Sequence, residues 1–217
     1  MNERLTMLKI LLADDHAVVR QGVKQILSES FAKATFGEAQ NVHELLELVH
    51  KGKWDVVILD LAMQGGSGLD TLKQIKHEQP QLPVLILSMY PEDQYAVRTL
   101  RAGAAGYLNK EGAPEELVQA VHKIMQGGKY ISASVGEELE WQLHRNPADD
   151  RPRHAALSDR EYEVLSMLAS GKRVSEISTA LSLSTKTIST YRARILEKMN
   201  MRTNAELTQY ALQNGLI

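Results

Sequence analysis

The feature that most constrains the fold is an alternation of short apolar runs with longer amphipathic stretches, repeated five times between residues 8 and 127. The apolar runs cover residues 8–13, 34–39, 56–59, 84–87 and 106–108. Three of these runs are too continuously apolar for a sheet with one solvent-exposed face, which indicates parallel strands buried on both faces. The amphipathic stretches have helical periodicity and cover residues 18–28, 42–50, 69–79, 92–101 and 115–125. Five such units predict an α/β fold, a five-stranded doubly wound parallel sheet with helices on both faces.

The pattern changes after Gly127-Gly128. Residues 128–154 contain two prolines and a charge cluster, typical of an exposed linker, together with a predicted short helix over residues 135–144. Beyond the linker the chain reads as all-helical, with helices predicted over residues 159–169, 174–181, 185–199 and 205–213. Ser158 and Glu161 form a capping-box pattern at the start of the first of these helices. We therefore expect one domain over residues 1–127, a linker over 128–154 and a small all-α domain over 155–217.

Charge and composition narrow the class of protein. The chain has a net charge of −2, but residues 151–217 hold ten Lys and Arg against six Asp and Glu, a local charge of +4. A basic C-terminal module on an acidic body favours a nucleic-acid partner at that end, although chance alone could give this charge. The absence of cysteine excludes a disulfide framework and a thiolate metal site. We find no membrane-spanning run and no secretory segment at residues 1–5, so we expect a cytoplasmic protein with no membrane partner.

Polar residues follow four of the predicted strands. Asp14 and Asp15 follow the first, Asp60 the third, Ser88 the fourth and Lys110 the fifth. In an open α/β sheet chemistry gathers at the carboxyl ends of the strands, near the point where the strand order reverses. In the flavodoxin-like order 2-1-3-4-5 the first and third strands are neighbours, so the three carboxylates would share one pocket.

Three close carboxylates cannot all remain ionised unaided, and a hard divalent cation such as Mg²⁺ resolves the conflict. With the cation bound, Asp60 could act as an ionised nucleophile toward a phosphoryl donor, and Lys110 would neutralise charge on the transferring oxygens. Simpler interpretations exist for each residue. Asp14 or Asp15 could cap the following helix, Asp60 could turn a loop, and Lys110 could be a solvated lysine. Their joint placement at strand ends favours the pocket.

At these positions the chain resembles the response-regulator receiver family over roughly residues 7–127. The resemblance rests on Asp14, Asp15, Asp60, Ser88, Tyr107 and Lys110. It implies that Asp60 is the phosphoacceptor and that Lys110 contacts the phosphoryl group. The implied Mg²⁺ ligands are Asp14, Asp15, Asp60 and the backbone carbonyl of Ala62. The Ser88 hydroxyl is implied to move toward the phosphoryl group as the Tyr107 ring rotates inward. One departure is Gln64, which stands where the family usually has proline.

The C-terminal helices have a helix–turn–helix arrangement. In the helix predicted over residues 185–199, Ile188, Ile195 and Met199 fall on one face and should pack inward. The opposite face carries short hydroxyl side chains and basic residues, which suits insertion into a major groove. Periodicity alone leaves open an ordinary helical bundle with a solvated face.

The order of residues over 155–217 resembles the LuxR-type helix-turn-helix, including Arg160-Glu161, Glu176-Ile177, Ser184, Thr187-Ile188 and Lys198-Met199. The resemblance implies a recognition helix from about Thr185 and a last helix that pairs DNA-bound monomers. The expected DNA-contacting residues are Lys186, Thr187, Ser189, Thr190, Arg192, Ala193 and Arg194. Val174 and Ser189 depart from the family, which commonly has asparagine and lysine there.

Together these patterns predict a response regulator that is not an enzyme. Its expected partners are a sensor histidine kinase, double-stranded promoter DNA and, when phosphorylated, a second copy of itself. Phosphorylation could act by releasing the DNA-binding domain or by dimerisation. Two alternatives remain: a flavodoxin-like or phosphatase enzyme, although Asp14-Asp15-His16 stand where a glycine-rich phosphate loop would be, and a regulator independent of phosphorylation.

Overall fold

The structure is a computed structural model that describes residues 8–90, 92–112, 114–132, 135–136 and 152–217. The chain divides into two compact units, Met1–Leu143 and His144–Ile217. Residues 137–144 of the predicted short helix over 135–144, and Pro147 of the linker, lie outside the described residues. At the start of the predicted linker, the Tyr130 N–H donates to the Ala105 carbonyl at 2.9 Å, and Tyr130 pairs with Gly106 as an isolated bridge.

The first unit is built on a five-stranded parallel sheet. Its strands are β1 (Lys9–Ala13), β2 (Thr35–Ala39), β3 (Val56–Leu59), β4 (Val84–Ser88) and β5 (Gly106–Asn109). They lie in the order β2-β1-β3-β4-β5, which confirms the predicted fold class and strand order. Ala13 pairs with Leu59 at the carboxyl ends of β1 and β3, so the residues that follow these two strands leave the sheet side by side.

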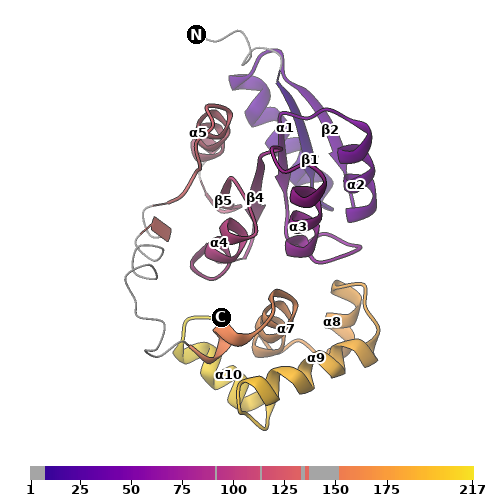
Figure 1. The fold of residues 1–217 in the computed structure, drawn as a ribbon, viewed down its shortest axis with the longest axis vertical. Helices are drawn as coiled ribbons and strands as arrows, with labels where there is room; N and C mark the ends of the chain where they lie inside the picture. Colours follow the sequence, from indigo (N-terminus) through magenta and orange to yellow (C-terminus); the bar gives the residue numbers. More distant parts are fainter. Residues whose placement is uncertain (1–7, 91, 113, 133–134, 137–151) are drawn as a thin grey trace. The chain divides into compact units, whose positions relative to one another are not determined.

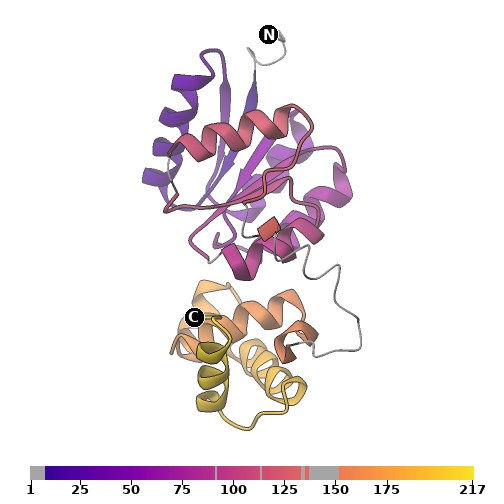
Figure 2. The same ribbon diagram turned by 90° about the vertical axis from the view of Figure 1, so that its left-hand side faces the viewer.

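Helices cover both faces of this sheet (Figure 1). They are α1 (Ala17–Ser30), α2 (Val42–Lys51), α3 (Gly68–Glu78), α4 (Glu92–Arg101) and α5 (Pro114–Met125). The helices α1 and α5 contact each other on one face, and Figure 2 views this face with α5 crossing in front of the strands. The helices α2 and α3 contact each other on the opposite face, where α4 also lies. The two-sided cover explains why the central strands have no polar alternation.

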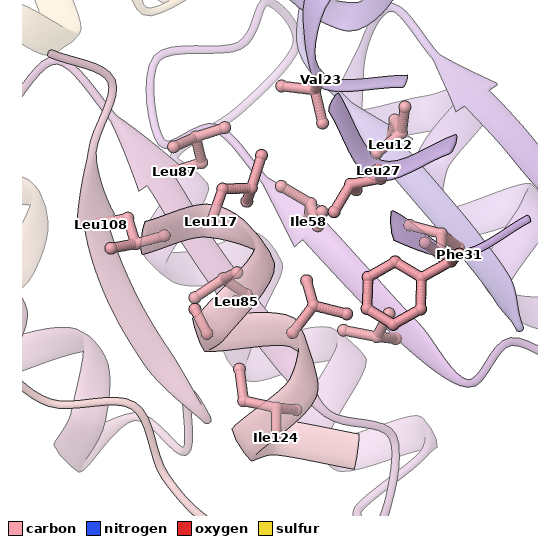
Figure 3. Packing of buried hydrophobic residues seen from close by; sticks show 14 of the residues in the cluster. Leu12, Val23, Leu27, Phe31, Ile58, Leu85, Leu87, Leu108, Leu117 and Ile124 are labelled. Atoms are coloured by element: carbon pink, nitrogen blue, oxygen red, sulfur yellow. The ribbon is translucent and has the colours of Figure 1, made fainter. Parts of the chain in front are cut away.

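The main core lies between the sheet and the α1–α5 layer (Figure 3). Leu27 of α1, Phe31 at the C-cap of α1 and Ile124 of α5 pack over Ile58 and Leu85 of the central strands. Each fully buried side chain of this kind contributes about 1.5–3 kcal/mol relative to its exposed state. This packing fixes the sheet, and with it the loops that leave its carboxyl edge.

The second unit is all-helical. It contains the 3₁₀ turn η2 (Arg153–Ala156) and the helices α7 (Asp159–Ala169), α8 (Val174–Ala180), α9 (Thr185–Lys198) and α10 (Asn204–Gln213). The predicted capping box is present, because Ser158 accepts the Glu161 N–H and Glu161 accepts the Ser158 N–H. Ile188, Ile195 and Met199 are fully buried, as predicted for the inner face of α9. Among the described helices, none has the length and apolar character needed to cross a membrane.

Candidate functional site

The carboxyl edge of the sheet gathers the predicted acidic residues. Asp60 follows β3 and is 2% exposed, and Asp14 follows β1 and is 5% exposed. The Asp60 N–H donates to the Ala13 carbonyl at 2.9 Å, which continues the β1–β3 ladder and brings the two aspartates together. One ligand atom from each of Asp14, Asp15, His16 and Asp60 lies within 4.8 Å of the others. The strand order therefore assembles the three carboxylates as the sequence predicted.

Lys110 bridges two of these carboxylates. Its Nζ lies 2.6 Å from Asp14 Oδ2 and 2.7 Å from Asp60 Oδ2, and its side chain is 9% exposed. Burial alone would lower the pKa of Lys110, but the hydrogen bonds to Asp14 and Asp60 and their negative charges outweigh it and raise the pKa. Lys110 is therefore a fixed cation. One ammonium group facing three carboxylates still leaves the pocket short of positive charge.

One oxygen of Asp15 has no hydrogen-bond donor among the residues that the structure describes. This oxygen is the buried Oδ1; the exposed His16 ring places Nδ1 at 2.7 Å from it, an ion-pair distance without hydrogen-bond geometry. An acceptor buried in this way costs about 1–3 kcal/mol, and a cation would satisfy it. The cluster of Asp14, Asp15 and Asp60 is thus compatible with Mg²⁺, which takes oxygen ligands.

The helix-capping alternative for Asp14 and Asp15 is wrong in its simple form. The N-cap of α1 is His16, whose side chain makes no capping hydrogen bond. Asp14 Oδ1 instead accepts the His16 backbone N–H at 2.7 Å, which shapes the turn between β1 and α1. The other carboxylate oxygen of Asp14 remains on Lys110.

The loop after Asp60 is held closely without a proline at position 64. The Ala62 N–H donates to Asp60 Oδ1 at 3.1 Å, and the Gln64 carbonyl accepts the Val42 N–H at 3.1 Å. Gly68, the first residue of α3, lies so near the loop that an added Cβ would stand 2.4 Å from Leu61 Cα. Backbone contacts therefore fix the Asp60 loop. The role of the Ala62 carbonyl as a ligand stays a prediction.

Ser88 is the last residue of β4 and Tyr107 is the second residue of β5, and both are buried. The Tyr107 hydroxyl donates to the Tyr90 carbonyl at 2.7 Å, and the Tyr90 N–H donates to Ser88 Oγ at 3.3 Å. Burial strongly raises the pKa of Tyr107, so its hydroxyl remains a neutral donor. The Tyr90 ring in turn stacks on Tyr95 of α4, with centroids 4.6 Å apart. The structure therefore links Ser88 to α4 through Tyr90.

The second group of predicted residues lies along α9. Lys186, Ser189, Thr190, Ala193 and Arg194 are exposed, whereas Thr187 and Arg192 are half-buried. The Ser189 and Thr190 hydroxyls donate to carbonyls four residues earlier, at 2.8 and 3.0 Å, which leaves their oxygens available as acceptors.

Thr187 and Arg192 are already engaged within the unit. The Thr187 hydroxyl is 2.8 Å from Ser184 Oγ at the helix cap. Arg192 Nε donates to Asn204 Oδ1 of α10 at 2.6 Å, so its guanidinium joins α9 to α10.

Comparison with known proteins identifies the family of this chain. Residues 10–122 match the response regulator receiver domain, and residues 155–211 match the luxR family of bacterial regulatory proteins. The response regulator GacA of Pseudomonas aeruginosa is 35% identical over 211 residues, covering 97% of this chain and 98% of that protein. UvrY of Escherichia coli strain K12 is 33% identical and covers 97% and 96%. The chain belongs to the response regulator family.

Solved structures agree with this family. A structure of RcsB from Salmonella typhimurium has a TM-score of 0.70 and 29% identity and covers 94% of this chain and 96% of its own. RcsB of Salmonella enterica serovar Typhimurium bound to the rprA promoter with the phosphomimetic BeF₃⁻ has a TM-score of 0.65, 29% identity and coverages of 94% and 97%. These relatives are DNA-binding regulators and not enzymes, so the enzyme alternative is set aside.

Three residues of this response regulator's pocket were not predicted. His16 joins the acidic cluster, Tyr90 joins Ser88 to Tyr107, and Arg20 of α1 reaches the Asp14 backbone. The only sequence signal for His16 is its position directly after Asp14-Asp15. Tyr90 contacts Ser88 and Tyr107 through its backbone, and Arg20 is one polar residue on an amphipathic helix. Neither can be recognised as a pocket residue from its side-chain type.

Proposed function

We propose that phosphorylation of Asp60 switches this response regulator and that α9 binds double-stranded promoter DNA. The observation that carries the proposal is the Lys110 ammonium, held 2.7 Å from Asp60 Oδ2 and 2.6 Å from Asp14 Oδ2 in a buried acidic pocket. A carboxylate needs no general base at neutral pH, so Asp60 can attack a phosphoryl donor directly. Lys110 can leave the carboxylate and neutralise charge on the incoming phosphoryl oxygens.

Mg²⁺ is the proposed cofactor. Asp14, Asp15 and Asp60 would hold it, with the Ala62 carbonyl as a further ligand. Two observations support the fit: the charge deficit that remains after Lys110, and the buried Asp15 Oδ1 without a hydrogen bond. When bound, the ion supplies positive charge to the phosphoryl oxygens during transfer. The chain itself orients Asp60 through the Ala62 N–H and the backbone contact at Gly68.

Ser88 and Tyr107 are the proposed switch. A phosphoryl group on Asp60 offers new acceptor oxygens to the Ser88 hydroxyl. Ser88 Oγ now accepts the Tyr90 N–H, and Tyr90 stacks on Tyr95 of α4. Movement of Ser88 toward the phosphoryl group would therefore disturb Tyr90 and the adjoining end of α4. This gives phosphorylation a differential contact with a surface that a second copy could read.

Helix α9 is the proposed recognition helix. Lys186 and Thr187 would lie near phosphates, and Ser189, Thr190 and Ala193 would face base edges. Arg194 would contribute a phosphate contact, and Arg192 would do so only if its hydrogen bond to Asn204 yields. RcsB, similar over both domains, has been solved on promoter DNA and as dimers on DNA, which supports a paired arrangement on two half-sites.

The remaining proposals concern partners and limits. A sensor histidine kinase is the proposed phosphoryl donor, and promoter DNA as a target implies action in the bacterial cytoplasm. We propose that phosphorylation favours a homodimer. The receiver limits 1–127, the linker 128–154 and the DNA-binding limits 155–217 stay predictions.

The decisive experiment is phosphorylation of the full-length chain by acetyl phosphate with Mg²⁺. We expect the mass of one phosphoryl group to be added to the wild type and none to Asp60→Asn, because amide nitrogen cannot replace the nucleophilic oxygen. Omission of Mg²⁺ should also prevent labelling. Undiminished labelling of Asp60→Asn would remove Asp60 from the role.

A further inference from the structure

Arg20 of α1 is a buried cation that the phosphoryl chemistry does not use. It is 6% exposed. Its Nη1 donates to the backbone carbonyl of Asp14 at 2.7 Å, and its Nε donates to Glu38 Oε2 at 3.1 Å. Arginine is almost never buried to this degree without partners, and here both partners lie at the carboxyl edge of the sheet.

The Asp14 carbonyl belongs to the peptide bond that joins the two neighbouring aspartates of the pocket. The Asp14 N–H donates to the Ala39 carbonyl at 3.2 Å, so the Asp14 backbone is fixed on both sides. Both anchors come from the end of β2, directly through Ala39 and through Glu38 by way of Arg20. Asp14, Arg20 and Asp60 also line one small cavity beneath the pocket. These two anchors, from Ala39 and from Glu38 through Arg20, form a clamp on the Asp14 backbone. The clamp sets where the Asp14 and Asp15 side chains leave the chain.

Charge compensation allows a guanidinium at this place. An unpaired guanidinium beside a divalent cation would repel the ion. Glu38 pairs with Arg20 and also accepts from Lys24 Nζ at 3.1 Å. The hydrogen bonds from Lys24 and Arg20 hold the pKa of Glu38 below its usual value, so the carboxylate stays ionised. The pair thus supplies a rigid hydrogen bond to the Asp14 carbonyl near the cation site at little electrostatic cost.

We propose that Arg20, oriented by Glu38, is a positioning residue that fixes the Asp14–Asp15 turn for Mg²⁺. The proposal rests on the proposed function of the acidic pocket. Residues that orient metal ligands commonly change metal affinity by about 10–100-fold when they are substituted. A purely structural ion pair would change the stability of the domain and leave the affinity for Mg²⁺ unchanged.

The test is a titration of the full-length chain with Mg²⁺ alone, followed by the amide NMR signals of the pocket loops. Arg20→Met should weaken Mg²⁺ binding by about tenfold, because the Asp14 carbonyl loses its donor. Arg20→Lys keeps the charge but cannot span both acceptors, so it should bind with intermediate affinity. Glu38→Gln should also weaken binding, most at low salt, because Arg20 is then left uncompensated.

Lys24→Met is the matched control. It removes the other cation on Glu38 without touching Asp14, so its affinity for Mg²⁺ should equal that of the wild type. The rate of labelling by acetyl phosphate adds a second readout. Arg20→Met should label about tenfold more slowly at low Mg²⁺ and recover at saturating Mg²⁺, since the nucleophile itself is intact.

The outcomes distinguish the positioning role of Arg20 from the proposed function of the acidic pocket. Wild-type affinity in both Arg20→Met and Glu38→Gln would overturn the positioning role while leaving the proposed function in place. Absence of any Mg²⁺-dependent shift in the wild type would overturn the proposed function itself. The spectrum before Mg²⁺ reports folding, and if Arg20→Met is unfolded, Arg20→Lys and Glu38→Gln decide.

Discussion

The acidic pocket and the exposed face of α9 are built in opposite ways. In the pocket, Lys110 lies 50 residues from Asp60 in the chain and is bonded to it at 2.7 Å, in a buried site. On α9, Ser189 and Thr190 are exposed and bond to carbonyls four residues earlier. The pocket exists only when the sheet is assembled, whereas the α9 face exists wherever that helix forms. Substitutions of Asp60 and Lys110 should therefore have nearly all-or-none effects on phosphorylation, and substitutions on α9 should have graded and additive effects on DNA binding.

The largest expected effect is at Lys110. Lys110→Met removes the cation that faces Asp14 and Asp60, so acyl-phosphate formation at saturating Mg²⁺ should slow by about 100-fold or more. Mass spectrometry over time with acetyl phosphate measures the rate. Lys123→Met is the control, because Lys123 is exposed on α5 and lies over the Tyr130 ring, away from the pocket. Equal rates for the two variants would mean that the buried ion pairs do not serve phosphoryl transfer.

A second prediction tests whether backbone contact fixes the Asp60 loop. Gly68→Ala should destabilise the receiver by about 1–3 kcal/mol, since the new Cβ must displace the Leu61 backbone. Gly22→Ala, also helical but with nothing within 4 Å of its Cβ, should instead stabilise by about 0.5–1 kcal/mol. Urea unfolding measures the free energy of unfolding of both variants. If Gly68→Ala leaves this free energy unchanged, the Leu61 backbone moves easily and the contact does not fix the loop.

Buried charges also occur in the C-terminal unit, at Glu161 and Glu163, so burial of charge is not confined to the pocket. The role of Glu161 can be tested by pH. Burial would raise the pKa of Glu161, but the hydrogen bonds from Lys198 and Ser158 outweigh it and lower the pKa. Its contribution to stability is therefore present above its unfolded pKa and is lost as pH falls through the lower folded pKa.

Glu161→Gln can keep the capping box but loses the charge. We expect a loss of about 1–2 kcal/mol at neutral pH and a flatter acid dependence below about pH 4.5. Hydrogen exchange of the α7 amides in the full-length chain, followed as a function of pH, measures this stability. An unchanged acid limb would assign the pH dependence to other carboxylates.

The smallest effects belong to α9. Lys186→Ala should weaken binding to every promoter fragment by about 1 kcal/mol and reduce the salt dependence by about one unit of slope. Thr190→Ala should instead change the ranking among sites, because Thr190 is expected at base edges. Fluorescence anisotropy at several salt concentrations separates the two. If the salt dependence of binding is unchanged in Lys186→Ala, Lys186 does not contact a phosphate and the proposed placement of α9 on DNA is wrong.

The sequence alone determined the elements and their type. The helix predicted over residues 92–101 has those bounds in the structure, and the Ser158–Glu161 capping box is present. The parallel sheet could be predicted because buried parallel strands carry a continuous apolar signal. The order of its strands came from the flavodoxin-like fold class, and the structure has that order. Asp14, Asp60 and Lys110 could be assigned to one pocket because strand ends meet at one edge of such a sheet.

Only the tertiary structure decided which groups complete the site. The Tyr90 backbone joins Ser88 to Tyr107, and Arg20 crosses from α1 to the Asp14 carbonyl and Glu38. On α9, the contact between Arg192 and Asn204 depends on how α10 packs. These contacts depend on loop paths and helix packing, which periodicity does not encode. Apolar patterning is a property of each segment, whereas hydrogen-bond partners are a property of the assembled fold.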